Sequence, residues 1–292
     1  MDRRQFSAGM LFTAFVAVAG AASGKASSNT SNAIRSALKQ LEVRSRGRLG
    51  VHMIAPSGQE FGYRSDERFM MLSSFKYLAS AFVLARVDQG AESLERLIRY
   101  GKQDLIEWSP VTKDHADGDG LTLSQLCHAT VTTSDNTAAN LILDSFGGPQ
   151  ALTRFLRKTG DRVTRLDRME PELNVRHASG PLDTTSPRAM ARTMKRLLSP
   201  GILSPASRQL LQHWLASNTT GGNRLKAGLP AGWTIGDKTG TFQNNANDVG
   251  VLFPPQGTPI FVAAYLEDSA TSSQIREQTL AEVGRIAATH LG

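Results

Sequence analysis

The spacing of hydrophobic residues changes twice along the chain and divides it into three parts. After a Ser/Asn-rich stretch at 23–32, apolar residues between positions 34 and 41 recur at helical spacing and predict an amphipathic helix. Two apolar runs follow at 49–55 and 60–63. The turn Pro56-Ser57-Gly58 lies between them, so this part of the chain predicts a β-hairpin.

The middle of the chain, from residue 73 to about residue 212, has almost wholly helical spacing. Within it, Ser186-Pro187 and Ser204-Pro205 each combine an N-cap serine with a first-turn proline and predict the start of a helix. Strand character then returns at 233–242, 248–253 and 260–266, and a final amphipathic helix is predicted at roughly 274–290.

Strands at both ends of the sequence with helices between them predict one architecture of the α/β (α+β) class. The two ends form an antiparallel sheet, the terminal helices pack on it, and an all-helical lobe is inserted. We therefore expect an α/β domain made of residues 27–65 and 216–292 and an all-α domain made of residues 66–215.

The first 26 residues have the features of an export signal. Asp2-Arg3-Arg4-Gln5-Phe6 precedes an apolar run at 11–19, and small residues follow it. The run is too short to span a membrane comfortably. Arg3-Arg4 with Phe6 resembles a twin-arginine signal, which directs export after folding, and an ordinary secretory signal is the alternative. We expect a periplasmic or secreted protein with no stable membrane anchor.

Composition excludes several classes of function. The 292 residues carry a net charge of +7, but Lys and Arg are scattered without interleaved aromatics, so we expect no nucleic-acid binding. Cys127 is the only cysteine, so the chain has no internal disulfide. It lies in an apolar helical pattern, which favours a small core residue over a catalytic thiol.

Four short motifs occur in a fixed order and carry the candidate chemistry. Each is weak alone, but together they supply a nucleophilic hydroxyl, an amine to activate it, a second hydroxyl, a carboxylate base and a cationic anchor. Such a set suits an enzyme that acylates its own serine and then hydrolyses the acyl group. The motifs are Ser73-Ser74-Phe75-Lys76, Ser134-Asp135-Asn136, Glu170-Pro171-Glu172-Leu173-Asn174 and Lys238-Thr239-Gly240.

Local structure alone offers simpler interpretations of two motifs. Ser73 and Lys76 are three residues apart and would share one helix face, with Ser73 near the helix start, where free N–H groups favour negative charge. The same spacing fits an ordinary amphipathic helix. Ser134, Asp135 and Asn136 are good helix N-cap residues, and capping is the alternative to a catalytic role.

In order and combination, the four motifs resemble those of the class A serine β-lactamases, from about residue 30 to the C-terminus. The resemblance implies an α/β domain and an α domain with the active site between them. It implies hydrolysis of β-lactam antibiotics through a serine acyl-enzyme, conferring resistance, with no metal and no cofactor. The partners would be small-molecule β-lactams, and we expect a monomer.

The resemblance also implies a role for each matched residue. Ser73 would attack, Ser134 would relay a proton, and Glu170 would direct the water that releases the acyl group. Whether Lys76 or Glu170 is the acylation base is disputed for this family. The implied substrate-binding residues are Asn136, Asn174, Lys238, Thr239, Gly240, Thr241, Arg224 and Trp108.

These binding residues would act in different ways. Asn136 would bind the acyl-amide carbonyl, Asn174 would help Glu170 hold water, and the N–H groups of Ser73 and Thr241 would form the oxyanion hole. Lys238 and Thr239 would bind the substrate carboxylate beside a gap at Gly240.

Three further matches are less specific. The chain lacks the strand arginine of many family members, and Arg224 matches another position for that cation; a solvated loop arginine is the alternative. Trp108 matches an aromatic wall at the cleft mouth, although a lone tryptophan is usually core. Arg168 and Asp183 match an ion pair that closes the Glu170 loop, and a weak surface salt bridge is the alternative.

Two other functions share part of this chemistry. Cell-wall D,D-carboxypeptidases share the serine and lysine motifs, but Glu170 with Asn174 argues against them. A β-lactam sensor would stay acylated and would need a membrane-spanning segment, which we do not find in the sequence. The motifs therefore favour a hydrolase that deacylates.

Overall fold

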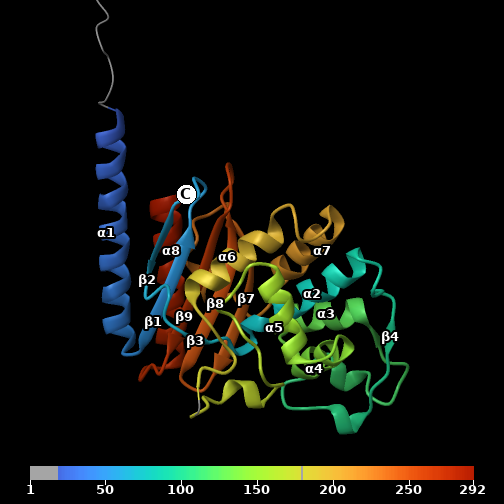
Figure 1. Cartoon of the computed structure of the whole chain (residues 1–292). Coiled ribbons are helices and arrows are strands. Elements are labelled where there is room, and N and C mark those ends of the chain that lie inside the picture. Colours follow the sequence, from blue (N-terminus) through green and yellow to red (C-terminus); the bar gives the residue numbers. More distant parts are fainter. Residues whose placement is uncertain (1–18, 179) are drawn as a thin grey trace, which may run out of the picture.

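A five-stranded antiparallel sheet organises the molecule (Figure 1). The computed structural model describes residues 19–178 and 180–292, and their side chains from residue 28 onward, so most of the predicted export signal lies outside the described residues. The strand order is β2-β1-β9-β8-β7, which places the two ends of the sequence side by side as predicted. The strands are β1 (Arg48–Ile54), β2 (Glu60–Tyr63), β7 (Thr234–Phe242), β8 (Asn245–Phe253) and β9 (Ile260–Glu267).

The two terminal helices, α1 (Ala19–Ser45) and α8 (Ser273–Leu291), cover one face of this sheet (Figure 1). Ile34 and Leu38 of α1 are fully buried in a cluster with apolar residues of β1, β9 and α8. The prediction of terminal helices on the sheet is confirmed. Helix α1 begins earlier than predicted and runs through the Ser/Asn-rich stretch, because intrinsic propensity is only a weak constraint on a helix.

Helices cover the opposite face and extend into the helical lobe (Figure 1). Helix α6 lies across β1, β8 and β9, and α2 continues from this layer into the lobe. Each of these helices begins where its sequence provides a cap or a turn. The six are α2 (Lys76–Asp88), α3 (Leu123–Thr132), α4 (Asn136–Ser145), α5 (Pro149–Lys158), α6 (Pro187–Leu198) and α7 (Pro205–Ala216).

The predicted serine caps are present. Ser186 accepts a hydrogen bond from the Ala189 N–H at 3.2 Å, and Ser204 accepts one from the Ser207 N–H at 3.2 Å. Each cap satisfies a backbone donor that the first helical turn cannot satisfy itself, and the following proline needs no such partner. The starts of α6 and α7 are therefore encoded locally.

The lobe also contains two small sheets that the periodicity did not predict. β3 (Phe69–Met70) pairs with β6 (Thr184–Thr185), and β4 (Leu97–Ile98) pairs with β5 (Leu121–Thr122). A two-residue strand is too short to show the alternation of apolar and polar residues from which strands are predicted. Across the described part of the chain, none of the helices has the length and apolarity needed to cross a bilayer.

A buried carboxyl pair connects β7 to β8. Asp237 and Asp248 are 3 % and 0 % exposed. Asp237 accepts a hydrogen bond from the Asn218 amide at 2.7 Å, and Asp248 accepts one from the Leu225 N–H at 3.1 Å. Burial raises the pKa of both groups, and the neighbouring charge of Asp237 raises that of Asp248 further. We infer that Asp248 keeps its proton, since two charges there would lie together out of water.

This pair predicts a pH-dependent stability. A carboxyl whose pKa is raised on folding stabilises the native state fully below its unfolded pKa, and this contribution is lost as pH rises through the folded pKa. As the pH rises above 3.8, the ordinary pKa of an aspartate, the free energy of unfolding of the wild type should therefore fall relative to that of Asp248→Asn. The fall should be up to about 1.4 kcal/mol per pH unit. Denaturant titrations from about pH 4 to about pH 8 measure it.

The matched control is Asp119→Asn, since Asp119 is exposed and makes no hydrogen bond or ion pair with the described residues. It should track the wild type at every pH. Parallel stability curves for wild type and Asp248→Asn would contradict the retained proton.

Candidate active site

Ser73 lies where the chain passes from the sheet region into helix α2. The 3₁₀ turn Leu72–Phe75 carries it, and Ser73 is half-buried while the rest of the turn is buried. Gly240 of β7 lies directly against this turn: a Cβ on Gly240 would be 2.9 Å from the Leu72 Cβ and 3.3 Å from the Ser73 nitrogen. The missing side chain at Gly240 therefore lets β7 approach the serine.

Lys76 is fully buried one turn after Ser73. Its Nζ donates to the Ser134 carbonyl at 2.8 Å and to Asn136 Oδ1 at 2.5 Å, and it lies 3.3 Å from Glu170 Oε1. Burial lowers the pKa of Lys76, and the negative charge of Glu170 opposes that change. Lys76 is thus a buried amine with a weakened hold on its proton, and polar partners surround it.

Glu170 brings the nucleophile and the amine together. The Ser73 hydroxyl donates to Glu170 Oε1 at 3.5 Å, and this is the same oxygen that Lys76 approaches. The other oxygen, Oε2, accepts a hydrogen bond from Asn174 Nδ2 at 2.5 Å. Glu170 is only 3 % exposed, and neighbouring groups therefore contact both of its carboxylate oxygens.

The loop that carries Glu170 is closed at its base by a buried carboxylate. Asp183 is 0 % exposed and pairs with Arg168 at 2.6 Å. It also accepts hydrogen bonds from the N–H groups of Asp167 and Arg168, at 2.7 and 3.0 Å. The alternative of a weak surface salt bridge is wrong, because one partner is fully buried. Glu172 is exposed, as expected for a residue outside the site.

Within the Ser134-Asp135-Asn136 motif, Asp135 caps a helix whereas Ser134 and Asn136 belong to the site. Asp135 caps α4 by accepting from the Ala138 N–H at 2.8 Å, so the capping alternative holds for this residue. Ser134 has a positive φ of 62°, and its Oγ accepts from Lys76 at 3.3 Å and from Lys238 at 3.1 Å. Its hydroxyl therefore lies between two ammonium groups instead of capping the helix.

Lys238 of β7 is the second buried cation. It is 0 % exposed and donates to Ser134 Oγ and to the Thr239 carbonyl, the latter at 2.9 Å. Burial holds the pKa of Lys238 well below its usual range, and the charge of Lys76 lowers it further, while Asp237 opposes the shift. Lys238, like Lys76, is therefore a buried amine with a weakened hold on its proton.

Arg224 is buried behind the edge strand, so the alternative of a solvated loop arginine is wrong. It is 5 % exposed and donates to the carbonyls of Gly240 at 3.0 Å and Asn247 at 2.8 Å. Its other terminal nitrogen donates to Thr241 Oγ1 at 2.6 Å. Burial lowers the pKa of Arg224, and the negative charges of Asp248 and Glu277 oppose that shift. Arg224 therefore places its charge beneath the end of β7.

Asn136 and Trp108 meet at the outer end of the site. The Asn136 amide donates to the Glu107 carbonyl at 2.9 Å, and its backbone N–H donates to the Trp108 carbonyl at 3.0 Å. Trp108 is 62 % exposed, and its ring N–H donates to the Thr133 carbonyl at 3.1 Å. Trp108 is therefore a surface residue, and the alternative of a core tryptophan is wrong.

Two residues around the site were not predicted from the sequence. Asn140 accepts from the Glu170 N–H at 3.0 Å and donates to the Glu170 carbonyl at 2.9 Å. Thr220 shares a 2.5 Å hydrogen bond with Thr239. The only local signal was a polar residue on a helix or loop, which is common, so only the folded chain reveals these contacts.

The remaining nucleophile candidate is inert. Cys127 is fully buried in α3, and burial raises its pKa to about 12, so its thiol stays protonated. The prediction of a small core residue is confirmed. Among the described residues, no group of His, Cys, Asp or Glu is arranged to hold a metal ion.

Comparison with known proteins matches almost the whole described chain. Residues 33–291 match the model of the β-lactamase enzyme family. The chain is 46% identical to β-lactamase L2 of Stenotrophomonas maltophilia over 86% of its own length and 84% of that protein. It is 40% identical to a β-lactamase of Amycolatopsis lactamdurans, covering 93% of this chain and 89% of that one.

Solved structures agree with the sequence comparison. The class A β-lactamase described as the last common ancestor of Gram-negative bacteria superposes with a TM-score of 0.87 at 54% identity, over 89% of this chain and 100% of that one. A variant of that enzyme bound to 5(6)-nitrobenzotriazole gives a TM-score of 0.86 at 54% identity, over 88% and 97% of the two chains. The fold, the order of the motifs and these similarities agree: this chain belongs to the class A serine β-lactamases and hydrolyses β-lactams.

Proposed function

We propose that Ser73 attacks the β-lactam carbonyl and forms the acyl-enzyme. The observation that carries this assignment is the convergence of three groups on one point. The Ser73 hydroxyl lies 3.5 Å from Glu170 Oε1, and Lys76 Nζ lies 3.3 Å from the same oxygen. Glu170 can receive the hydroxyl proton over this distance, directly or through one water, and Lys76, which approaches the same oxygen, is the alternative base. The lowered pKa of Lys76 suits it to this work, and the Glu170 carboxylate is equally well placed.

Release of the acyl group is assigned to Glu170 with Asn174. A carboxylate base must hold and deprotonate a water beside the ester, and an amide next to it can orient that water. Asn174 donates to the Glu170 oxygen that does not contact Ser73. Asn140 holds the Glu170 backbone from the other side, so we add it as a positioning residue.

Ser134 is the proton relay in this proposal. Its hydroxyl is within 3.3 Å of Lys76 and 3.1 Å of Lys238, so a proton can pass between the lysine side of the site and the leaving nitrogen. The backbone N–H groups of Ser73 and Thr241 would stabilise the oxyanion, since Gly240 brings β7 against the Ser73 turn.

The substrate carboxylate is assigned to Lys238, Thr239 and Arg224. The first two lie at the cleft end of β7, and Arg224 reaches the same end through its hydrogen bond to Thr241. Asn136 would bind the acyl-amide carbonyl, and the exposed ring of Trp108 would form a wall of the cleft mouth. The small-molecule β-lactam then meets cations at one end and an aromatic at the other.

The wider biology follows the family assignment. We infer that the enzyme acts as a monomer in the periplasm or outside the cell, after export by a twin-arginine signal, and that it confers resistance to β-lactam antibiotics. We also infer one lobe from residues 27–65 and 216–292 and a second from 66–215. The hydrophobic cluster beneath the terminal helices consists only of residues from 27–65 and 216–292, which supports the first lobe.

The first prediction separates acylation from deacylation. Ser73→Ala should abolish hydrolysis because the nucleophile is gone, whereas Glu170→Gln should acylate and then stall because its base is gone. Intact-mass analysis after mixing with benzylpenicillin should show a persistent adduct only for Glu170→Gln. Glu172→Gln is the matched control and should turn over normally, since Glu172 is exposed outside the site. Near wild-type turnover by Glu170→Gln would refute the loop assignment.

The second prediction concerns Arg224. Losing one charge-assisted hydrogen bond to the substrate carboxylate should lower kcat/KM of Arg224→Ala on benzylpenicillin by roughly 10- to 100-fold, or about 1.5–3 kcal/mol. The variant should also be less stable, because the carbonyls of Gly240 and Asn247 lose their donor. The methyl ester of the same penicillin separates the two effects. An equal loss on acid and ester would show that Arg224 only supports the strand.

The third prediction tests the export route. Replacing Arg3 and Arg4 with lysine should leave precursor in the cytoplasm, because twin-arginine signals are read by a receptor that requires the pair. Cell fractionation and detection of the precursor measure this. Arg35→Lys, in the described part of α1, is the control and should be exported normally. Normal processing of the Arg3/Arg4 variant would indicate the general secretory route.

A further inference from the structure

An open pocket of about 400 Å³ lies between helix α5 and the residues that begin the Glu170 loop. None of the proposed catalytic residues lines it. Its walls carry four arginines: Arg68 from the end of the sheet region, Arg154 and Arg157 from α5, and Arg165 from the loop base. Asp167 is the one carboxylate in the lining. Four cations against one anion leave a net charge of +3 around a space that holds several water-sized groups.

The arginines have few anionic partners of their own. Arg165 pairs with Asp167 at 2.5 Å. Arg68 donates to the Val163 carbonyl at 3.1 Å and to the Thr184 hydroxyl at 3.0 Å, and neither acceptor is charged. Both of these guanidinium groups therefore have acceptors, but only that of Arg165 pairs with a carboxylate.

The two arginines of α5 are also without a carboxylate. Arg157 donates to the carbonyls of Asp161 and Thr164, each at 2.6 Å. The Asp161 carboxylate is occupied elsewhere, by donors that include the Thr164 and Thr193 hydroxyls at 2.6 and 2.8 Å. The Arg154 side chain is exposed and makes no hydrogen bond or ion pair with any residue that the structure describes.

The guanidinium groups are close enough to repel one another. Burial lowers the pKa of Arg68, and the positive charges of Arg165 and Arg157 lower it further. The adjacent basic surface is different. There Arg188 pairs with Glu60 and Asp66, and Arg192 pairs with Glu60. The pocket beside α5, by contrast, brings together four arginines of which one, Arg165, pairs with a carboxylate.

We propose that this pocket binds a small, doubly charged tetrahedral oxyanion, either inorganic phosphate or a phosphate monoester. A tetrahedral oxyanion presents several oxygens in different directions, which suits guanidinium forks that approach from α5, the loop base and the sheet. Carbonyl bonds already fix Arg68 and Arg157, so little ordering is needed on binding. A flat carboxylate would satisfy one fork and leave the others repelling one another.

The pocket adjoins the closure of the catalytic loop. Asp167, which lines it, accepts a hydrogen bond from the Asp183 N–H at 2.9 Å and donates its own N–H to Asp183 at 2.7 Å. Arg165 pairs with Asp167, and Asp167 hydrogen-bonds Asp183, which closes the Glu170 loop. An anion bound to Arg165 is therefore linked to this closure through Asp167. Binding to the native state alone also stabilises the fold by mass action.

The test compares Arg154→Gln with Arg35→Gln. Arg154 lines the pocket, whereas Arg35 is an exposed arginine on α1 with no hydrogen bond or ion pair to the described residues. Isothermal titration with sodium phosphate, against sodium chloride of equal ionic strength, should show one site in the wild type and in Arg35→Gln. Loss of one charge-assisted contact should weaken phosphate binding by Arg154→Gln by about 10-fold or more. Phosphate should raise the Tm of the first two proteins more than that of Arg154→Gln.

Folding does not confound this comparison. Removing Arg154 relieves repulsion and breaks no bond, so the Tm of Arg154→Gln without phosphate should equal or exceed that of the wild type. Equal phosphate affinity in Arg154→Gln and Arg35→Gln, or responses matched by sodium chloride, would overturn the proposal.

A second arm distinguishes the source of the phosphate. Glycerol phosphate in solution and vesicles that contain phosphatidic acid present the same phosphate monoester in free and membrane-bound form. Competition between free phosphate and glycerol phosphate for binding to the wild type, and its loss in Arg154→Gln, supports a small-molecule site. If the wild type but not Arg154→Gln sediments with the vesicles, and free phosphate releases the protein from them, the same pocket binds a lipid headgroup. Vesicle binding that phosphate does not displace would overturn it.

Discussion

The burial of two lysine ammonium groups on either side of one serine hydroxyl is the constraint on which the rest of this site depends. Lys76 and Lys238 are both fully buried, and both donate to Ser134 Oγ. Two like charges out of water are costly unless neighbouring groups compensate them. Glu170 and Asn136 provide that compensation for Lys76, and Asp237 for Lys238. Burial, which this compensation offsets only in part, weakens the hold of both lysines on their protons, and this is the property that acyl transfer needs.

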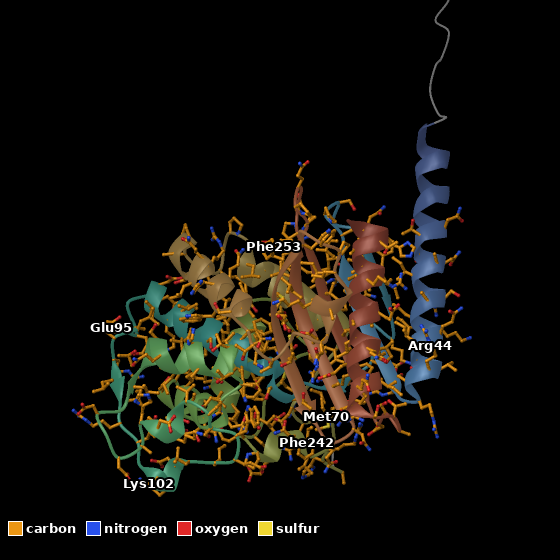
Figure 2. The ribbon with its side chains drawn as sticks, turned by 180° about the vertical axis from the view of Figure 1, so that it is seen from behind. Arg44, Met70, Glu95, Lys102, Phe242 and Phe253 are labelled. Carbon is orange, nitrogen blue, oxygen red and sulfur yellow. The ribbon has the colours of Figure 1, made fainter. Side chains whose placement is uncertain are left out.

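The sheet supplies the rigidity that keeps these groups in place. β7 is paired along its length with β8, and β8 with β9, so Lys238, Thr239 and Gly240 project from a strand with a fixed register. Figure 2 shows Met70 and Phe242 at the same end of the sheet and Phe253 at the opposite end, which marks the end of β7 that borders the Ser73 turn. Asn247 of β8 reinforces this junction by donating to the Met70 carbonyl at 2.9 Å. The loop closed by the buried Asp183 then brings Glu170 to Ser73 and Lys76 from the helical side.

Compensation of charge also explains the contrast between the site and the surface pocket. Within the core, each buried cation meets a carboxylate or several neutral acceptors, as Arg224 meets the carbonyls of Gly240 and Asn247. Beside α5, three arginines without a carboxylate partner line one pocket. Solvent and salt make such a cluster tolerable at the surface, whereas the interior does not tolerate it. An arrangement of this kind is therefore either costly or functional.

The sequence by itself determined the architecture, the starts of helices α6 and α7, and the family. Periodicity, the Ser186-Pro187 and Ser204-Pro205 caps and the four motifs are local signals, and local signals are readable without the fold. Only the tertiary structure decided how distant residues pair. It buried Arg224 instead of leaving it in solvent, exposed Trp108 instead of packing it, and joined Asn140 to Glu170. It also made the carboxyl pair of β7 and β8 and the arginine pocket beside α5. Burial and contacts between residues far apart in sequence arise only when the whole chain packs, so no local pattern could encode them.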